Sequence, residues 1–131
     1  MKKLLLILLT SLPMIVSAKE FSWVCAIEWT EDNPEWLFVY EDIKTQTDGN
    51  YRIFVKWEFP NETDDKAEAK QVWLISPDFE RIRVMSSVGY NRKGKIVYTD
   101  NIPQDWKFIL PDTYVESIVE TTKGILHSYG K

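Results

Sequence analysis

The chain has 131 residues, a formal net charge of −4 and aromatic residues at 14% of its positions. This acidic balance argues against general nucleic-acid binding, which needs an excess of cations to neutralise phosphates. The single cysteine excludes an internal disulfide, and one histidine with one cysteine argues against a transition-metal site, because such sites use several of these ligands.

The N-terminal residues 1–18 have the pattern of a secretory signal peptide. Lys2 and Lys3 precede an apolar run, and Ala18 ends a small-residue cleavage pattern. The apolar run is shorter than the about 20 residues that a transmembrane helix needs. We therefore expect an exported protein with no stable membrane anchor after signal cleavage, located in the periplasm, at the cell surface or in the medium. Residues 19–131 are expected to form a single domain.

Alternating apolar residues predict about six β-strands in this domain. The first strand is expected to carry four residues on one face, Phe21, Trp23, Cys25 and Ile27, with the cysteine buried. Asp48-Gly49 predicts a tight hairpin turn, and a second turn is expected at residues 91–94. The strands are predicted at residues 21–27, 36–43, 51–59, 71–76, 81–90 and 95–99, with an acidic loop at 60–68.

The last predicted element is an α-helix. Thr113 and Glu116 have the spacing of a capping box, in which the hydroxyl accepts from a backbone N–H and the carboxylate reaches back. One mostly apolar stripe at helical spacing follows, formed by Val115, Ile118, Val119, Thr122 and Leu126. Strands followed by a helix predict an α+β fold, in which a C-terminal helix packs on one face of an antiparallel, mostly meander sheet.

Residues for catalysis are few. His127 is the only histidine and lies near the C-terminus, which argues against a Ser-His-Asp or Cys-His arrangement. Two well-placed carboxylates can hydrolyse glycosides. However, Glu41/Asp42 lie in an expected strand, where adjacent residues point to opposite faces, and the other two pairs, Glu31/Asp32 and Asp64/Asp65, lie in expected loops. We therefore predict a protein that is not an enzyme and holds no cofactor or metal.

Five cations gather in the last predicted hairpin, Arg81, Arg83, Arg92, Lys93 and Lys95. In an acidic protein they are expected to form a charge-segregated edge, and the two strand arginines should share one face. One interpretation is edge protection, in which charge prevents pairing with other sheets. The other is a contact with an anion or a partner protein. Core packing is expected for most of the tryptophans at positions 29, 36, 57, 73 and 106, and any that stay exposed are a second candidate contact, because aromatic residues are frequent in binding hot spots.

Residues 81–119 also resemble a known family. Tyr90, Gly94 and Lys95 in the hairpin turn are followed by Trp106 and by Pro111 with Thr113 at the start of the helix. These residues, with the earlier segment GNYRIFVKWEF, are similar to those of the bacterial surface-adhesin protein E family. The resemblance implies a sheet-plus-helix domain related to an adhesin that binds host matrix proteins and haem. The lone His127 argues against haem, and no small residue precedes Cys25 as a lipid-anchor motif requires.

Together these patterns predict an exported, non-enzymatic, adhesin-like domain that contacts a protein or glycan partner through the basic hairpin or the open sheet face. Replacing Arg83 and Lys93 by Glu is expected to abolish capture of this partner and to leave the fold intact. One alternative is a structural periplasmic or secreted domain that self-associates as a homodimer. The other alternative is a carboxylate-dependent hydrolase.

Overall fold

The computed structural model describes residues 20–28, 30–31, 35–60 and 67–130. The predicted signal peptide at residues 1–18, Trp29 and the carboxylates Asp32, Asp64 and Asp65 lie outside the described residues. The strands are β1 (Trp23–Ile27), β2 (Trp36–Tyr40), β3 (Lys44–Thr45), β4 (Tyr51–Glu58), β5 (Glu68–Ile75), β6 (Arg81–Tyr90), β7 (Ile96–Asp100) and β8 (Lys107–Phe108), and helix α2 spans Tyr114–Gly130.

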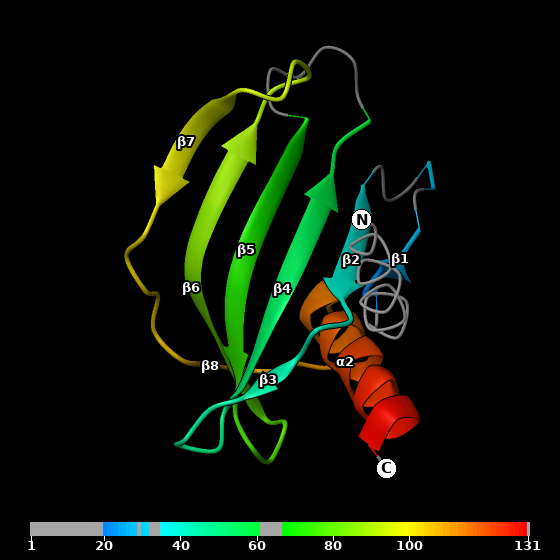
Figure 1. The fold of residues 1–131 in the computed structure, drawn as a ribbon, viewed down its shortest axis with the longest axis vertical. Coiled ribbons are helices and arrows are strands. Elements are labelled where there is room, and N and C mark those ends of the chain that lie inside the picture. The colour runs from blue at the N-terminus through cyan, green and yellow to red at the C-terminus, as the bar shows by residue number, and fades with distance from the viewer. Residues whose placement is uncertain (1–19, 29, 32–34, 61–66, 131) are drawn as a thin grey trace, which may run out of the picture.

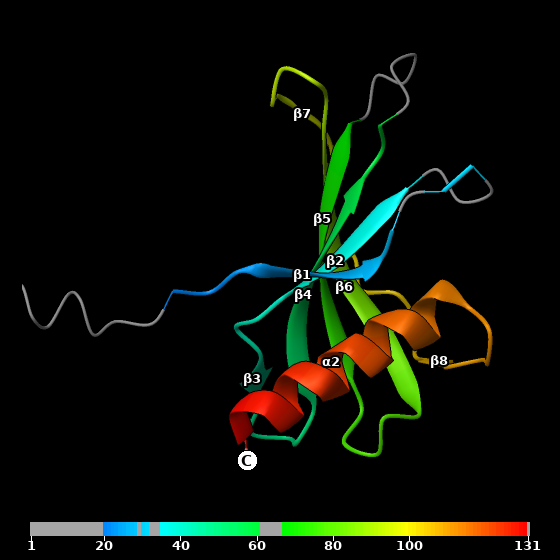
Figure 2. The ribbon, with the colours of Figure 1, turned by 90° about the vertical axis from the view of Figure 1, so that its right-hand side faces the viewer.

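The strands form one antiparallel sheet in the order β1-β2-β4-β5-β6-β7, with β3 beside β4 and β8 beside β6 (Figure 1). The main path follows the chain order, so the sheet is a meander. Helix α2 lies on one face of this sheet and contacts β1 and β2 (Figure 2). The α+β fold predicted from the sequence is therefore confirmed. Among the described residues, no helix has the length and apolar character needed to cross a membrane.

Two strands differ by three residues at one end from the boundaries that alternation predicted, and the others differ by two residues or fewer. The strand expected at residues 36–43 stops at Tyr40, because the backbone N–H of Ile43 bonds the carbonyl of Glu41 at 3.0 Å. Pairing with β4 resumes only at β3. The strand expected at residues 71–76 begins earlier, at Glu68, which pairs with Tyr90 of β6. The end of the expected acidic loop is therefore strand.

Bulges reverse the alternation within three strands. In β6, Val84 pairs with Trp73 and Ser86 with Val72, which leaves Met85 as an extra residue. In β1 and β7 the extra residues are Ala26 and Val97. Because a bulge adds one residue to one strand, residues beyond it turn to the opposite face.

The β1 bulge corrects the prediction for the first strand. Cys25 pairs with Phe38, whereas Ile27 pairs with the buried Leu37. The two residues therefore lie on opposite faces. Cys25 is exposed, because it lies at the edge of the sheet on the face that the helix leaves uncovered.

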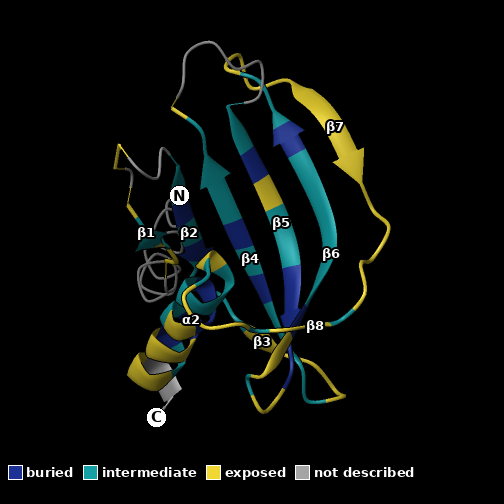
Figure 3. Ribbon diagram, turned by 180° about the vertical axis from the view of Figure 1, so that it is seen from behind, coloured by how far each residue is buried: buried dark blue, intermediate teal, exposed yellow. Residues whose placement is uncertain are grey.

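The core lies between the sheet and α2, on the face seen in Figure 3. Strand residues at every second position point into it, and the helix adds the central residues of its apolar stripe. Its buried members are Leu37, Val39, Ile53, Val55, Trp73, Ile75, Ile82, Ile118, Val119 and Ile125. Ile125 is buried and Leu126 is half-buried. The last buried residue of the apolar stripe is therefore Ile125, and not Leu126 as predicted.

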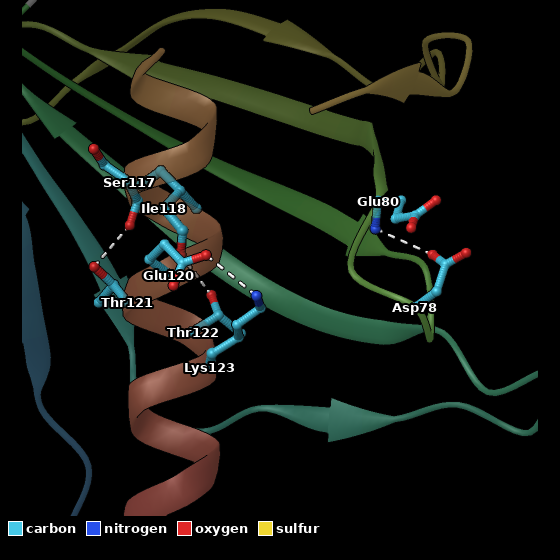
Figure 4. Close-up of polar contacts among 8 residues, drawn as sticks. All are labelled: Asp78, Glu80, Ser117, Ile118, Glu120, Thr121, Thr122 and Lys123. Carbon is cyan, nitrogen blue, oxygen red and sulfur yellow. Dashed lines mark hydrogen bonds and ion pairs between the residues drawn. The ribbon is translucent and has the colours of Figure 1, made fainter. Parts of the chain in front are cut away.

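The start of α2 is capped largely as predicted. The hydroxyl oxygen of Thr113 accepts from the backbone N–H of Glu116 at 3.3 Å. The Glu116 carboxylate reaches back, but its partner is the N–H of Asp112 at 2.9 Å. Within the helix, the buried hydroxyl of Thr122 donates to the carbonyl of Ile118 at 2.8 Å, which satisfies it in the core (Figure 4).

The turn between β5 and β6 is held against the helix. The Ser76 hydroxyl donates to the Asp78 carboxylate at 2.6 Å. The same carboxylate accepts from the N–H of Glu80 at 3.1 Å (Figure 4). Phe79 has a positive φ of 61°, and its ring stacks on Tyr51 at 5.1 Å. The ammonium of Lys123 in α2 lies 5.4 Å from the same ring. Packing around this ring therefore holds a backbone conformation that is costly for a bulky residue.

Candidate functional site

The two faces of the sheet differ in charge. On the helix side, the inward positions of β4, β5 and β6, which the structure describes in full, are uncharged: Tyr51, Ile53, Val55, Trp57, Ala69, Gln71, Trp73, Ile75, Ile82, Val84, Ser87 and Gly89. The helix-free face lies toward the viewer in Figure 1. The cross-strand register places six cations on it, Lys44, Arg52, Lys56, Lys70, Arg81 and Arg83. An acidic protein thus concentrates positive charge on one face.

Aromatic rings cover the β1–β2–β4 part of the helix-free face. Tyr40 lies at the centre, with ring centroids 4.9 Å from Trp23, 6.0 Å from Phe21 and 6.2 Å from Phe54. Trp36 and Phe38 stack at 6.1 Å in β2. These rings are half-buried, except for Phe21, which is exposed. We call these rings and the six cations together the basic–aromatic face.

Two of the cations are placed by these rings. The Lys56 ammonium lies 4.7 Å from the Trp23 ring and 4.9 Å from the Phe38 ring. The guanidinium of Arg52 lies 4.4 Å from the Phe54 ring. A cation over an aromatic face is attracted by the ring quadrupole, so the charges and the rings hold one another in position.

The middle of this face has an unfavourable charge pattern. Lys56 is directly opposite Lys70 across β4 and β5, and Glu58 is directly opposite Glu68. Each lysine is paired instead along its own strand, at 3.3 Å and 3.6 Å from the neighbouring carboxylates. Like charges directly opposite each other destabilise a sheet, so the arrangement is not the best one for folding. Sites that break a local folding rule are where function is expected.

The predicted basic hairpin is divided in the structure. Arg81 and Arg83 lie at the start of β6 and share one face, as predicted. Arg92, Lys93 and Lys95 lie in the turn after its end. The nine residues from Arg83 to Arg92 span about 30 Å of extended chain, so the five cations do not form one patch.

Both arginines at the start of β6 contact the segment that connects β7 to α2, residues 101–113. The Nε of Arg83 donates to the carbonyl of Gln104 at 2.7 Å, and the guanidinium of Arg81 lies 5.9 Å from the Trp106 ring. They therefore help to hold this connecting segment in place. The register also places Arg83 in one row with Leu74 and Arg52 on the basic–aromatic face, a grouping that was not predicted from the sequence.

One of the three turn cations, Arg92, lines a cavity that Glu68 and Lys70 of β5 also line. The turn itself forms as predicted, with Gly94 at a φ of 82°. The side-chain amide oxygen of Asn91 accepts from the backbone N–H groups of Lys93 and Lys95 at 2.9 and 3.0 Å. Arg92 donates to the carbonyl of Phe59 at 3.1 Å. A cavity of about 540 Å³ lies beside the turn, lined by Ala67, Glu68, Lys70, Tyr90, Asn91, Arg92 and Gly94.

The residues considered for catalysis lie apart. Cys25 is on β1, and His127 is an exposed residue in the last turn of α2. Partial desolvation raises the pKa of the Cys25 thiol, and the carboxylates of Glu28 and Glu58 add to the shift. A raised pKa disfavours the thiolate needed for nucleophilic attack. Among the described residues, no cluster of three or more His, Cys, Asp or Glu residues could hold a metal ion.

Comparison with protein-family models, with curated proteins and with solved structures found no match to this chain. The resemblance to the surface-adhesin protein E family and the functions that it implies therefore stay predictions. The candidate site depends on the geometry of the chain itself.

Proposed function

We propose that this chain is an exported, non-enzymatic binding domain that contacts an acidic protein partner through its basic–aromatic face. The segregation of charge supports this function most directly. Six cations lie on one face of an acidic protein, while the opposite positions of β4, β5 and β6 are uncharged. Complementary charge steers association and selects partners, and aromatic side chains supply contact area at an interface.

The mixture of charges on this face favours a protein over a polyanionic glycan. Glu58 and Glu68 lie beside Lys56 and Lys70, so the centre of the face presents both signs. A polyanion is best bound by an unbroken excess of cations, because each anionic group must be neutralised. A protein surface can instead match a row of lysines and a row of glutamates separately.

A non-catalytic role is supported by the distribution of carboxylates. Among the residues that the structure describes, one carboxylate, Glu68, lines the cavity beside the β6–β7 turn, and one, Glu41, lines a second cavity between β1 and α2. Glycoside hydrolysis normally needs two carboxylates across one site. Export is proposed from the sequence of residues 1–18, and an adhesin-like role from the resemblance of residues 81–119.

The test compares two pairs of lysines by capture of partners from the cell envelope and the medium. One variant carries Lys44→Gln with Lys70→Gln on the basic–aromatic face, and its control carries Lys93→Gln with Lys95→Gln in the β6–β7 turn. Both remove two exposed positive charges. We expect the face variant to lose an acidic partner that the wild type and the turn variant retain.

The opposite pattern would reassign the site. Loss of the partner only in the turn variant would favour the basic hairpin. Equal retention by both variants would contradict a role for the basic–aromatic face. Competition by heparin with no acidic protein captured would favour an anionic glycan as the partner.

A second candidate function is self-association through the edge of the sheet. β7 is the last strand of the sheet, and Ile96 and Val97 are 61% and 46% exposed. An exposed apolar edge strand can pair with a second copy. Light scattering tests this function, because a monomer at high micromolar concentration would exclude it.

A further inference from the structure

The helix side of the sheet contains a pocket beyond the part that α2 covers. The pocket has a volume of about 230 Å³ and is lined by Trp57, Phe59, Ala69, Gln71 and Tyr98. Helix α2 lies over the β1–β2 end, while the chain between β7 and α2 crosses the lower ends of the strands (Figure 3). The pocket therefore lies away from the basic–aromatic face, and its use does not depend on the function proposed for that face.

The pocket arises from the order of large and small residues along one row that crosses four strands. Trp57, Ala69, Gly89 and Tyr98 are successive cross-strand neighbours in one row. The two small residues leave a gap between the two aromatic residues. Gly89 leaves room for the Tyr98 ring, because a Cβ atom at position 89 would overlap that ring. The tyrosine ring therefore lies across the glycine and forms one wall of the pocket.

Trp57 forms the opposite wall and is held by two neighbouring rings. It stacks on Phe59 with a centroid distance of 6.1 Å and meets Tyr114 at 5.1 Å, edge to face. Tyr114 is the first residue of α2, so the start of the helix supports this wall. A pocket whose aromatic walls are fixed before binding spends little entropy on ordering them.

The polar group of the pocket has a defined orientation. The Oε1 atom of Gln71 accepts from the indole N–H of Trp57 at 3.1 Å and of Trp73 at 2.8 Å. Indole nitrogen is a donor only, so the amide oxygen must face the two rings. The amide nitrogen then donates to Ser87 at 3.3 Å, and the Ser87 hydroxyl bonds the Tyr98 hydroxyl at 3.0 Å.

This network leaves a donor for a ligand. A glutamine amide has two N–H hydrogens, and within the described part of the chain only the bond to Ser87 uses one of them. The pocket thus combines fixed aromatic walls with an oriented amide donor, and those of its lining residues that the structure describes are uncharged. Its volume is below the roughly 300–1,000 Å³ of pockets that hold drug-sized ligands, so it suits a single ring.

We propose that this pocket binds one neutral sugar ring, a pyranose residue at the end of a glycan. A pyranose presents apolar C–H groups on one face and hydroxyls around its edge. The C–H face would pack on Tyr98, and a hydroxyl would accept from the Gln71 amide. A charged ligand would find no partner among the described lining residues, and a purely apolar ring would leave the amide donor buried and unpaired.

The test uses the full chain, expressed with its N-terminal segment, and titrates it with methyl pyranosides of glucose, galactose, mannose and N-acetylglucosamine. The NMR signals of the Trp57 and Trp73 indole N–H groups report directly, since both bond the Gln71 side chain. We expect one or more of the pyranosides to shift both signals saturably, with a dissociation constant of about 1 mM. Indole serves as a ring without hydroxyls and is expected to bind more weakly.

Two variants of the same strand locate the site. Tyr98→Ala removes the wall and should weaken binding by about tenfold or more, which corresponds to loss of one stacking contact. Val97→Ala is the matched control, since Val97 is the extra residue of the bulge and does not line the pocket. Either of two results would overturn the proposal: no pyranoside shifts the indole signals, or the affinity is the same in both variants.

Discussion

The helix side and the helix-free side of this sheet are made by the same strands but follow different chemical rules. On the helix side, uncharged residues alternate into a core that includes Val55 and Trp73, and helix α2 closes it. On the other side, lysines face lysines and rings remain half-buried. Burial thus accounts for the composition of one face and leaves the composition of the other unexplained. The unexplained face is where we place binding.

The largest effect on stability should come from replacing a valine by alanine on each face of the sheet. Val55→Ala on the helix side should lower the free energy of unfolding by about 2–3 kcal/mol, from two lost methyl groups and the cavity they leave. Val72→Ala on the helix-free side should cost less than half of this, because Val72 is only half-buried. Urea denaturation measures both. Equal losses would show that the two faces do not differ in burial.

A smaller effect tests whether the Tyr98 ring limits the size of the residue at position 89. Gly89→Ala should destabilise the protein by about 1–2 kcal/mol, because the added Cβ must displace the ring. The same change made in a Tyr98→Ala background should be neutral or stabilising, since alanine suits a strand better than glycine does. A double-mutant cycle measures this coupling. Independent effects would mean that the ring does not lie over the glycine.

A charge-conserving swap probes the basic–aromatic face. Glu68→Lys with Lys70→Glu places opposite charges across both cross-strand pairs, Lys56 with position 70 and Glu58 with position 68. The swap should stabilise the fold by about 0.2–1 kcal/mol, because opposite charges then face each other. Thermal denaturation at low and high salt gives the readout. A loss of stability would indicate that the present arrangement is already the best one for folding.

The smallest effect is expected from Asp78, in the turn between β5 and β6. The Ser76 hydroxyl and the Glu80 N–H hold the pKa of the Asp78 carboxyl below its ordinary value. The stability that this adds is present above the unfolded pKa of about 3.9 and is lost as pH falls through the lower folded value. Asp78→Ala should therefore flatten the acid limb of melting temperature against pH. An unchanged acid limb would contradict this assignment.

Most of the fold could be predicted because its signals are local. The Thr113 hydroxyl caps the helix as its spacing to Glu116 predicts, and Gly94 supplies the positive φ of the last hairpin turn. Alternation also located the β4 residues on each face. The bulges could not be predicted, since one extra residue such as Met85 leaves no mark in composition. Cys25 was wrongly expected to be buried for this reason.

The candidate site was harder to predict because it depends on register. Arg81 and Arg83 are near Arg92 in sequence, but the strand carries the turn about 30 Å away. On the helix-free face the row of Arg83 continues through Leu74 of β5 to Arg52 of β4, and the sequence does not state how these strands pair. The pocket had one signal that was overlooked. A glycine inside a strand often marks a close approach, and here Gly89 marks the position of the Tyr98 ring.

The most direct test of the central claim is partner capture by the charge-swapped variant, Glu68→Lys with Lys70→Glu, beside the wild-type chain. The swap keeps net charge, composition and fold, and changes only which charge occupies which row of the basic–aromatic face. If that face contacts an acidic protein partner, the variant should fold at least as stably as the wild type and fail to capture the partner. Capture at wild-type affinity by a folded variant would contradict the account.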